Sequence, residues 1–223
     1  MDKYKQEETL CLINELIDAF PDVPSGVKCV DVRRNKIREI KLDAETAVEY
    51  LDASDNAIKT FDNLDGIKSL KVLDVGYNLL KNLPKIELPQ LRELYVMSND
   101  ICKIENLAGF PNLEKFDIAN NEIRTVENID CPGLVEAYFG ANCIDAVKDL
   151  SSLICLKTLD LQCNKLRELD CALLPTSLEV LLLQGNTELR NLANLERLEN
   201  LKIISLKYTR ISKLKSNDKF EVW

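Results

Sequence analysis

The sequence predicts an α/β solenoid, in which short parallel strands stack side by side into one curved sheet. Asparagines recur 21 or 22 residues apart, a threonine follows the last of them after 23 residues, and apolar residues keep a fixed register around each position. An apolar-x-apolar pair precedes nearly every asparagine, as expected for a half-buried strand. The 223 residues include only seven glycines and seven prolines, so no flexible linker interrupts the pattern.

The repeating unit is L-x-x-L-x-L-x-x-N-x-I-x-x-I. No single unit can bury its apolar edge alone, so neighbouring units must stack and share one core. The asparagine amide can both donate to and accept from backbone groups that the turn leaves unpaired, so we expect it to be buried and hydrogen-bonded. The pattern is that of a leucine-rich repeat horseshoe, with about nine strands on its concave face between residues 26 and 214. Its marker positions are Asn35, Asn56, Asn78, Asn99, Asn121, Asn142, Asn164 and Asn186, with Thr209 in the ninth place.

The two ends of a solenoid need caps, because an open end exposes core and strand edges. Residues 1–25 are predicted to form an N-terminal capping helix, since Leu10, Ile13, Leu16, Ile17 and Phe20 follow helical spacing and stop at Pro21. A helix that binds a partner is the alternative. Residues 215–223 replace a full return segment and are expected to form a short strand or a tail.

The composition argues against catalysis. The chain has no histidine, which removes the commonest general base and metal ligand, and it has no nucleotide-binding or nucleophile-elbow motif. We therefore expect no enzyme activity, no cofactor and no metal, with a carboxylate-only enzyme as the remaining alternative. The net charge of −8 argues against nucleic acid and anionic membranes as partners and favours a basic protein surface.

The cellular compartment is predicted from cysteine usage. Eight cysteines are scattered without a C-x-x-C pair, and no signal peptide or spanning segment is evident. An intracellular, reducing environment is expected.

The strand positions that point away from the core should line the concave face. Four residues before each marker position stand Asp31, Asp52, Asp74, Tyr95, Asp117, Tyr138, Asp160, Leu182 and Ser205. Stacked like charges ~4.8 Å apart are destabilising, so this column favours a functional role over stability alone. The plainer alternative is a solvated face that must be polar in any case. The alternation of tyrosines with carboxylates favours an interface, because tyrosines are frequent interface anchors.

Three stretches of the repeats resemble a known family. Leu73-Asp74-Val75 with Asn78-Leu79-Leu80, the segment Lys103–Leu107, and the segment Val126–Asp130 are typical of 22-residue repeats of the SDS type. The chain resembles the leucine-rich regulatory subunit of type-1 serine/threonine protein phosphatase. The resemblance implies a nuclear and cytoplasmic protein that holds or matures an inactive form of the enzyme.

The resemblance also implies where the partner binds. In the family the concave face contacts the phosphatase catalytic subunit, and the acidic and aromatic contacts fall here on Asp74, Tyr95, Asp117 and Tyr138. A later family motif, Glu-Phe-Trp, is similar to Glu221-Val222-Trp223. The chain departs from the family at Ser205, where an acid is usual, and it lacks the family's C-terminal cap. Together with the outer strand positions, the expected partner-binding residues are Asp74, Glu93, Tyr95, Asp117, Glu136, Tyr138, Asp160, Glu221 and Trp223.

The expected function is thus a non-enzymatic regulatory subunit, monomeric when free, that binds the catalytic subunit of a type-1 phosphatase. A structural adaptor of a ciliary dynein or spliceosomal type of assembly is the alternative within the same repeat class. A recognition domain for a ligase is the third possibility, and it would need a catalytic partner chain.

Overall fold

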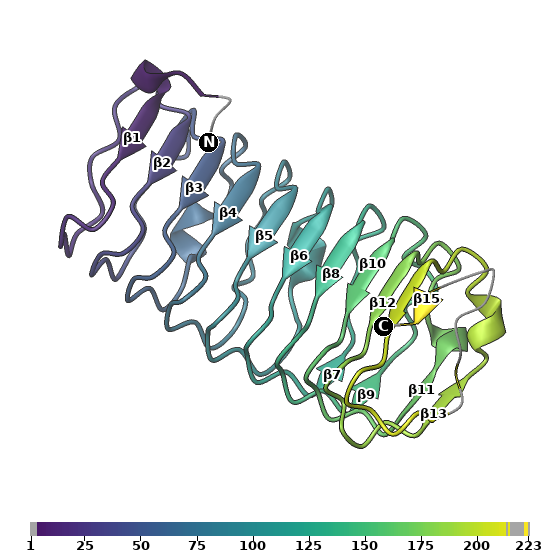
Figure 1. Ribbon diagram of the computed structural model, residues 1–223. Coiled ribbons are helices and arrows are strands. Elements are labelled where there is room, and N and C mark those ends of the chain that lie inside the picture. Colours follow the sequence, from purple (N-terminus) through teal and green to yellow (C-terminus); the bar gives the residue numbers. More distant parts are fainter. Residues whose placement is uncertain (1–3, 213, 215–220, 223) are drawn as a thin grey trace.

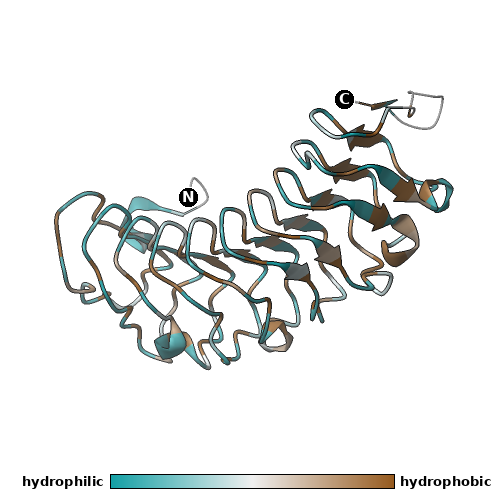
Figure 2. Ribbon diagram, turned by 90° about the horizontal axis from the view of Figure 1, so that it is seen from below, coloured by the Kyte–Doolittle hydropathy of each residue, from teal (hydrophilic) through white to brown (hydrophobic). Residues whose placement is uncertain are grey.

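The computed structural model describes residues 4–212, 214, 221 and 222, and it forms a single curved solenoid (Figure 1). Each repeat contributes one short strand to the same sheet and then returns along the opposite side. Figure 2 shows the arc from the side, with the strands on its inner side and the helical turns of the return segments on its outer side. The predicted leucine-rich repeat horseshoe is confirmed.

The main sheet has eleven strands among the described residues, all parallel and in sequence order. Nine of them are the predicted repeat strands, and the sheet gains β1 and β15 at its two ends. Their bounds are β1 Thr9–Cys11, β2 Cys29–Asp31, β3 Tyr50–Asp52, β4 Val72–Asp74, β5 Glu93–Tyr95, β6 Lys115–Asp117, β8 Glu136–Tyr138, β10 Thr158–Asp160, β12 Val180–Leu182, β14 Ile203–Ser205 and β15 Glu221–Val222.

The return side is built from short turns, and its helical segments among the described residues are single 3₁₀ turns. Two small parallel sheets also form there, one pairing β7 with β9 and the other pairing β11 with β13. The bounds are η1 Gln6–Glu8, η2 Asp62–Leu64, η3 Leu107–Gly109, η4 Cys171–Leu173, η5 Leu195–Arg197, β7 Thr125–Val126, β9 Ala146–Val147, β11 Glu168–Asp170 and β13 Asn191–Ala193.

The marker asparagines form a ladder that joins each repeat to the one before it. In Asn78, Oδ1 accepts the Ile58 N–H at 2.9 Å, and Nδ2 lies 3.1 Å from the carbonyl oxygens of Ala53 and Val75. The residue before each marker position is left-handed, with φ between 52° and 76°, from Asn14 through Tyr208. That conformation costs about 1–2 kcal/mol for most residues, and the amide bonds offset it. The predicted buried asparagines are confirmed for Asn78 through Asn186, while Asn35 and Asn56 are half-buried.

The core runs without a break through the stack, because the middle residue of each strand pairs in register with the next. Leu73, Leu94 and Phe116 are neighbours in this row and are fully buried. Phe116 stands beside the small Ala137 in the next strand, and its ring meets Phe139 edge to face with centroids 6.1 Å apart. A large residue beside a small one keeps the packing dense without straining the strand spacing.

The N-terminal capping helix predicted over residues 1–25 is wrong for the part that the structure describes. Thr9–Cys11 is a strand that pairs with β2, and Leu12 O accepts a hydrogen bond from Asn35 Nδ2, the bond that later marker asparagines such as Asn56 and Asn78 make to the repeat before them. Leu10, Leu12 and Ile17 therefore occupy the inward positions of a degenerate repeat with Glu15 at the marker place. Pairing with the edge of β2 satisfies backbone groups that a helix would leave exposed on that strand.

At the other end Glu221–Val222 forms β15 and pairs with Ile203 and Ile204 of β14. Of the two possibilities for residues 215–223, the structure therefore shows a short strand at these two positions. Val222 packs against the end of the core.

Candidate partner-binding face

The predicted partner-binding column lies on the inner face of the sheet, where the strands hold it in register. Asp74, Tyr95, Asp117, Tyr138 and Asp160 are the last residues of β4, β5, β6, β8 and β10, and each pairs directly with the next. Parallel pairing in register places these five side chains in one row, as predicted. Asp160 is buried, while the other four are half-buried.

Glu93, Tyr95, Lys115, Glu136 and Tyr138 form a connected group at the middle of this face, called the central cluster below. The Tyr95 hydroxyl donates to Glu93 Oε2 at 2.6 Å, and the Tyr138 hydroxyl donates to Glu136 Oε2 at 2.9 Å. Lys115 Nζ lies 3.0 Å from Glu136 Oε2, with the two tyrosine rings on the strands to either side of it. The hydroxyl bonds fix both rings, so the cluster presents two ordered aromatic surfaces.

Each carboxylate of the row accepts the same type of local hydrogen bond. Oδ1 of Asp74, Asp117 and Asp160 accepts the backbone N–H two residues further on, at 2.8–3.0 Å. Burial nevertheless raises the pKa of Asp117 and Asp160 above the usual range. Burial, with the nearby charges of Asp52 and Asp117, raises the pKa of Asp74 to about 6. These three groups carry a desolvation cost that an added positive charge would relieve.

The pKa values of the two tyrosines and of Glu136 are also shifted by their neighbours. Burial and the hydrogen bond to Glu136 raise the pKa of Tyr138 to about 12, and burial with the bond to Glu93 raises that of Tyr95 further. The Lys115 ammonium lowers the pKa of Glu136. Both phenols are therefore neutral hydrogen-bond donors at physiological pH, and Glu136 is ionised.

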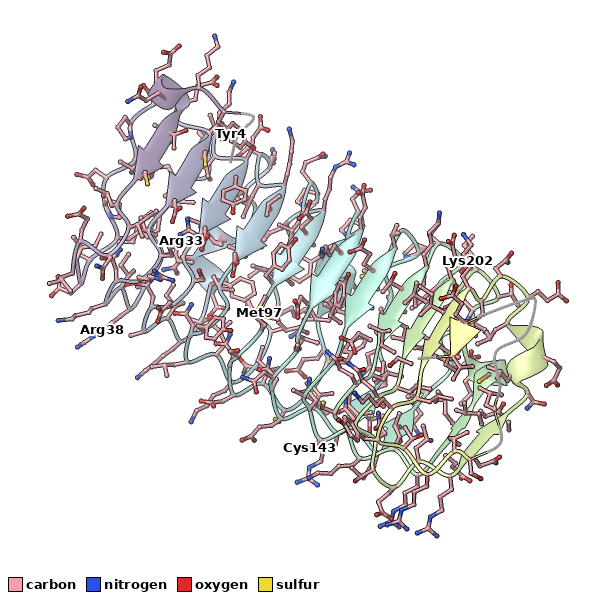
Figure 3. The ribbon with its side chains drawn as sticks, in the orientation of Figure 1. Tyr4, Arg33, Arg38, Met97, Cys143 and Lys202 are labelled. Atoms are coloured by element: carbon pink, nitrogen blue, oxygen red, sulfur yellow. The ribbon has the colours of Figure 1, made fainter. Side chains whose placement is uncertain are left out.

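At the N-terminal end of the row the expected ladder of like charges has a counter-charge. The Arg33 guanidinium lies 3.1 Å from Asp31 Oδ2 and 3.7 Å from Asp52 Oδ2. Figure 3 shows Arg33 at the carboxyl ends of β2 and β3, whereas Arg38 points outward from the edge of the solenoid. Asp31 has no exposed surface. The inference of function from repulsion between Asp31 and Asp52 is weakened, because Arg33 supplies a shared counter-charge, although burial and the Asp52 charge still raise the pKa of Asp31.

The C-terminal residues are not brought to the central cluster. Glu221 lies on β15, separated from β8 by β10, β12 and β14 in the sheet order. Trp223 lies outside the described residues. The Glu-x-Trp part of the resemblance therefore stays a prediction.

Lys115 and Arg33 were missed as site residues by sequence reasoning. Both stand at outward strand or turn positions beside acidic columns, Lys115 six and Arg33 two residues before a marker asparagine. A basic residue inside an otherwise acidic or aromatic column is the signal that could have identified them. Its effect depends on side-chain direction, which the sequence pattern does not specify.

Among the described residues, no group of three or more cysteine, aspartate or glutamate side chains is arranged to hold a metal ion. None of the helices described is long and apolar enough to cross a bilayer.

Comparison with known proteins supports the fold. YopM from Yersinia enterocolitica matches 97% of the chain at 24% identity with a TM-score of 0.72, and the match covers 50% of that protein. YopM from Yersinia pestis, a leucine-rich effector protein, matches 86% at 25% identity with a TM-score of 0.71 and 52% coverage. InlJ from Listeria monocytogenes matches 83% at 20% identity with a TM-score of 0.61 and 45% coverage. The chain has the leucine-rich repeat fold.

The chain spans about half the length of these solved structures. No protein-family model matches it, and no curated protein matches it. The similarity therefore concerns the stacked repeats and their curvature, and the function must be argued from the inner face itself.

Proposed function

We propose that the chain is a non-enzymatic regulatory subunit whose inner face binds a basic surface of the catalytic subunit of a type-1 protein phosphatase. The central cluster carries this proposal, because it combines ordered aromatic anchors with surplus negative charge. The family resemblance of the repeats supplies the identity of the partner, and the charge and geometry supply the mode of binding.

The charge balance of the face favours a basic partner. Across β4 to β10 the outward strand positions carry five carboxylates, Asp74, Glu93, Asp117, Glu136 and Asp160, and one cation, Lys115. With all of these groups ionised, this part of the face has a charge of −4. A basic partner is attracted by this field and associates faster, especially at low salt.

The tyrosines supply the anchoring contacts. Tyr95 and Tyr138 are half-buried, and their hydroxyls are held by Glu93 and Glu136, so little side-chain entropy is lost when a partner covers them. Buried aromatic anchors at the centre of an interface typically lose about 2 kcal/mol or more on truncation. The position of the cluster near the middle of the sheet makes it the expected centre of the interface.

The pH dependence of binding follows from Asp74. Its pKa of about 6 means that it is partly protonated at slightly acidic pH and ionised above neutral pH. A basic partner prefers the ionised form, so binding should tighten as pH rises from about 5 to 7.5.

The test is titration calorimetry with the phosphatase catalytic subunit. Tyr138→Ala should weaken binding at least about tenfold, with the melting temperature within a few degrees of the parent, because the side chain points away from the core. Tyr77→Ala is the matched control, since Tyr77 is 58% exposed and stands at the asparagine turn. Equal affinities for Tyr95→Ala, Tyr138→Ala and the parent would contradict the proposed face. A pull-down that retains axonemal or ribonucleoprotein components and no phosphatase would favour the adaptor alternative.

A further inference from the structure

Lys115 lies between two aromatic rings and a carboxylate at the centre of the inner face. Its Nζ is 5.7 Å from the centroid of the Tyr95 ring and 5.3 Å from that of Tyr138. It also lies 3.0 Å from Glu136 Oε2. All these residues come from three neighbouring strands, β5, β6 and β8, so the register of the sheet fixes their spacing.

This geometry is that of a binding site for a cation. An ammonium or guanidinium within about 6 Å of an aromatic centroid is attracted by the negative face of the ring. Two rings and an ionised carboxylate act here on one nitrogen. The Tyr95 and Tyr138 hydroxyls donate to Glu93 and Glu136, so each ring has a hydrogen bond of its own to hold it besides its contact with Lys115.

We infer that this is a subsite for an arginine side chain of the partner, and that Lys115 occupies it in the free protein and is displaced on binding. The inference rests on the proposed function of the same face. The lysine side chain is 32% exposed, so its ammonium can swing into water while its stem stays on the sheet. A guanidinium stacks on aromatic faces and pairs with carboxylates in two-pronged fashion, and it is more weakly hydrated than an ammonium.

Lys115 has opposite effects on the free and the bound protein. In the free protein its charge lowers the pKa of Glu136 and partly offsets the raised pKa of Asp117, so it stabilises the ionised carboxylates of the inner face. During binding it competes with the incoming cation for the same rings and carboxylate. Replacing it by a neutral side chain should therefore strengthen the binding of an arginine.

The experiment uses Lys115→Met in the full chain, with a peptide of four Gly-Arg repeats as the probe. Calorimetry at pH 7.5 and low salt should show binding about tenfold tighter than for the parent, because the competitor is gone and the ring contacts become available. The same peptide with citrulline in place of arginine keeps the shape without the charge, and it should show no gain. Lys115→Gln is a second neutral variant and should show a gain of similar size.

Two controls separate a subsite from a general charge effect. Lys157→Met removes the same charge just before β10, where the lysine pairs with Glu179 at 3.4 Å, and it should change affinity less than about twofold. Adding Tyr95→Leu and Tyr138→Leu to Lys115→Met should abolish the gain, because leucine keeps an apolar side chain without an aromatic face. Thermal melts check that each variant is folded.

The results distinguish this inference from the proposed function. Equal gains for Lys115→Met and Lys157→Met, or a gain that survives the two leucine changes, would overturn the subsite even if the phosphatase binds. A ring-dependent gain with the arginine peptide would support the subsite even if the phosphatase does not bind.

Discussion

The aspartates of the inner-face column have different surroundings at the N-terminal end of the sheet, in β2 and β3, and at its centre, in β6. In β2 and β3, Asp31 and Asp52 are buried and face the Arg33 guanidinium. In β6, Asp117 is half-buried, with an aromatic neighbour on each side, and burial raises the pKa of Asp117 as it does that of Asp31. The local bond is the same, since the backbone N–H two residues on donates to Oδ1 in both Asp31 and Asp117.

The difference comes from the residue two positions after each aspartate. Arg33 reaches back to the carboxylates of Asp31 and Asp52, whereas Gly76 and Ala119, two residues after Asp74 and Asp117, bring no charge to the column. The same repeat position is therefore buried beside a cation at one end and half-buried at the centre, where we propose that the partner binds. The electrostatic effect of one column of charged residues on the inner face therefore depends on the residues in the column beside it.

The largest expected effect tests whether the two regions share the same core. Leu51→Ala in β3 and Leu94→Ala in β5 each remove a fully buried side chain from the same row. Each should lower the free energy of unfolding by about 2–5 kcal/mol, measured by urea denaturation. A loss confined to one of the two would mean that the regions differ in packing as well as in charge.

The next effect tests the roles of the two cations. Arg33→Met leaves Asp31 and Asp52 without their counter-charge, and it should cost about 2 kcal/mol at pH 7. Lys115→Met should cost less than about 0.5 kcal/mol, because its ion pair is partly exposed. Equal costs in the same denaturation experiment would remove the distinction between a structural and a displaceable cation.

A smaller effect concerns the pH dependence of stability at Asp74. Its folded pKa of about 6 lies above the unfolded value, so the parent loses stability as pH rises from about 4 to 7. Asp74→Asn lacks this loss and keeps an Oδ1 that can accept the Gly76 N–H. The variant should be more stable than the parent by about 1 kcal/mol at pH 8 and equal to it near pH 4, after allowance for partial exposure. Parallel melting curves across this pH range would show that Asp74 is not desolvated.

The smallest effect concerns the rate of partner binding. Asp117→Asn should slow association with the phosphatase catalytic subunit a few-fold and reduce its salt dependence, because it removes a charge from the open part of the face. Asp31→Asn is the matched change in the buried region and should leave the association rate unchanged. Stopped-flow association at several salt concentrations measures both, and an equal slowing by the two variants would contradict the comparison.

Much of this architecture could be predicted from the sequence because the repeat pattern is redundant. Each marker asparagine, such as Asn78 or Asn121, and each inward leucine reports the same register. The predicted order of Asp74, Tyr95, Asp117, Tyr138 and Asp160 along the face follows from that register alone. The first repeat escaped prediction, because Leu10, Leu12 and Ile17 fit a strand and turn while Leu10, Ile13 and Ile17 fit a helix equally well.

The sequence by itself therefore determined the solenoid, its register and the residues of the inner face, since period-two strands and a fixed repeat length leave one way to stack. The tertiary structure decided that Thr9–Cys11 pairs with β2, because only the open edge of that strand makes pairing better than a helix. It also decided which cations neutralise which acids. Arg33 reaches two buried aspartates, and Lys115 lies between two tyrosines. These contacts depend on the conformations of long, flexible side chains that cross from one strand to the next, and the repeat pattern does not specify those conformations.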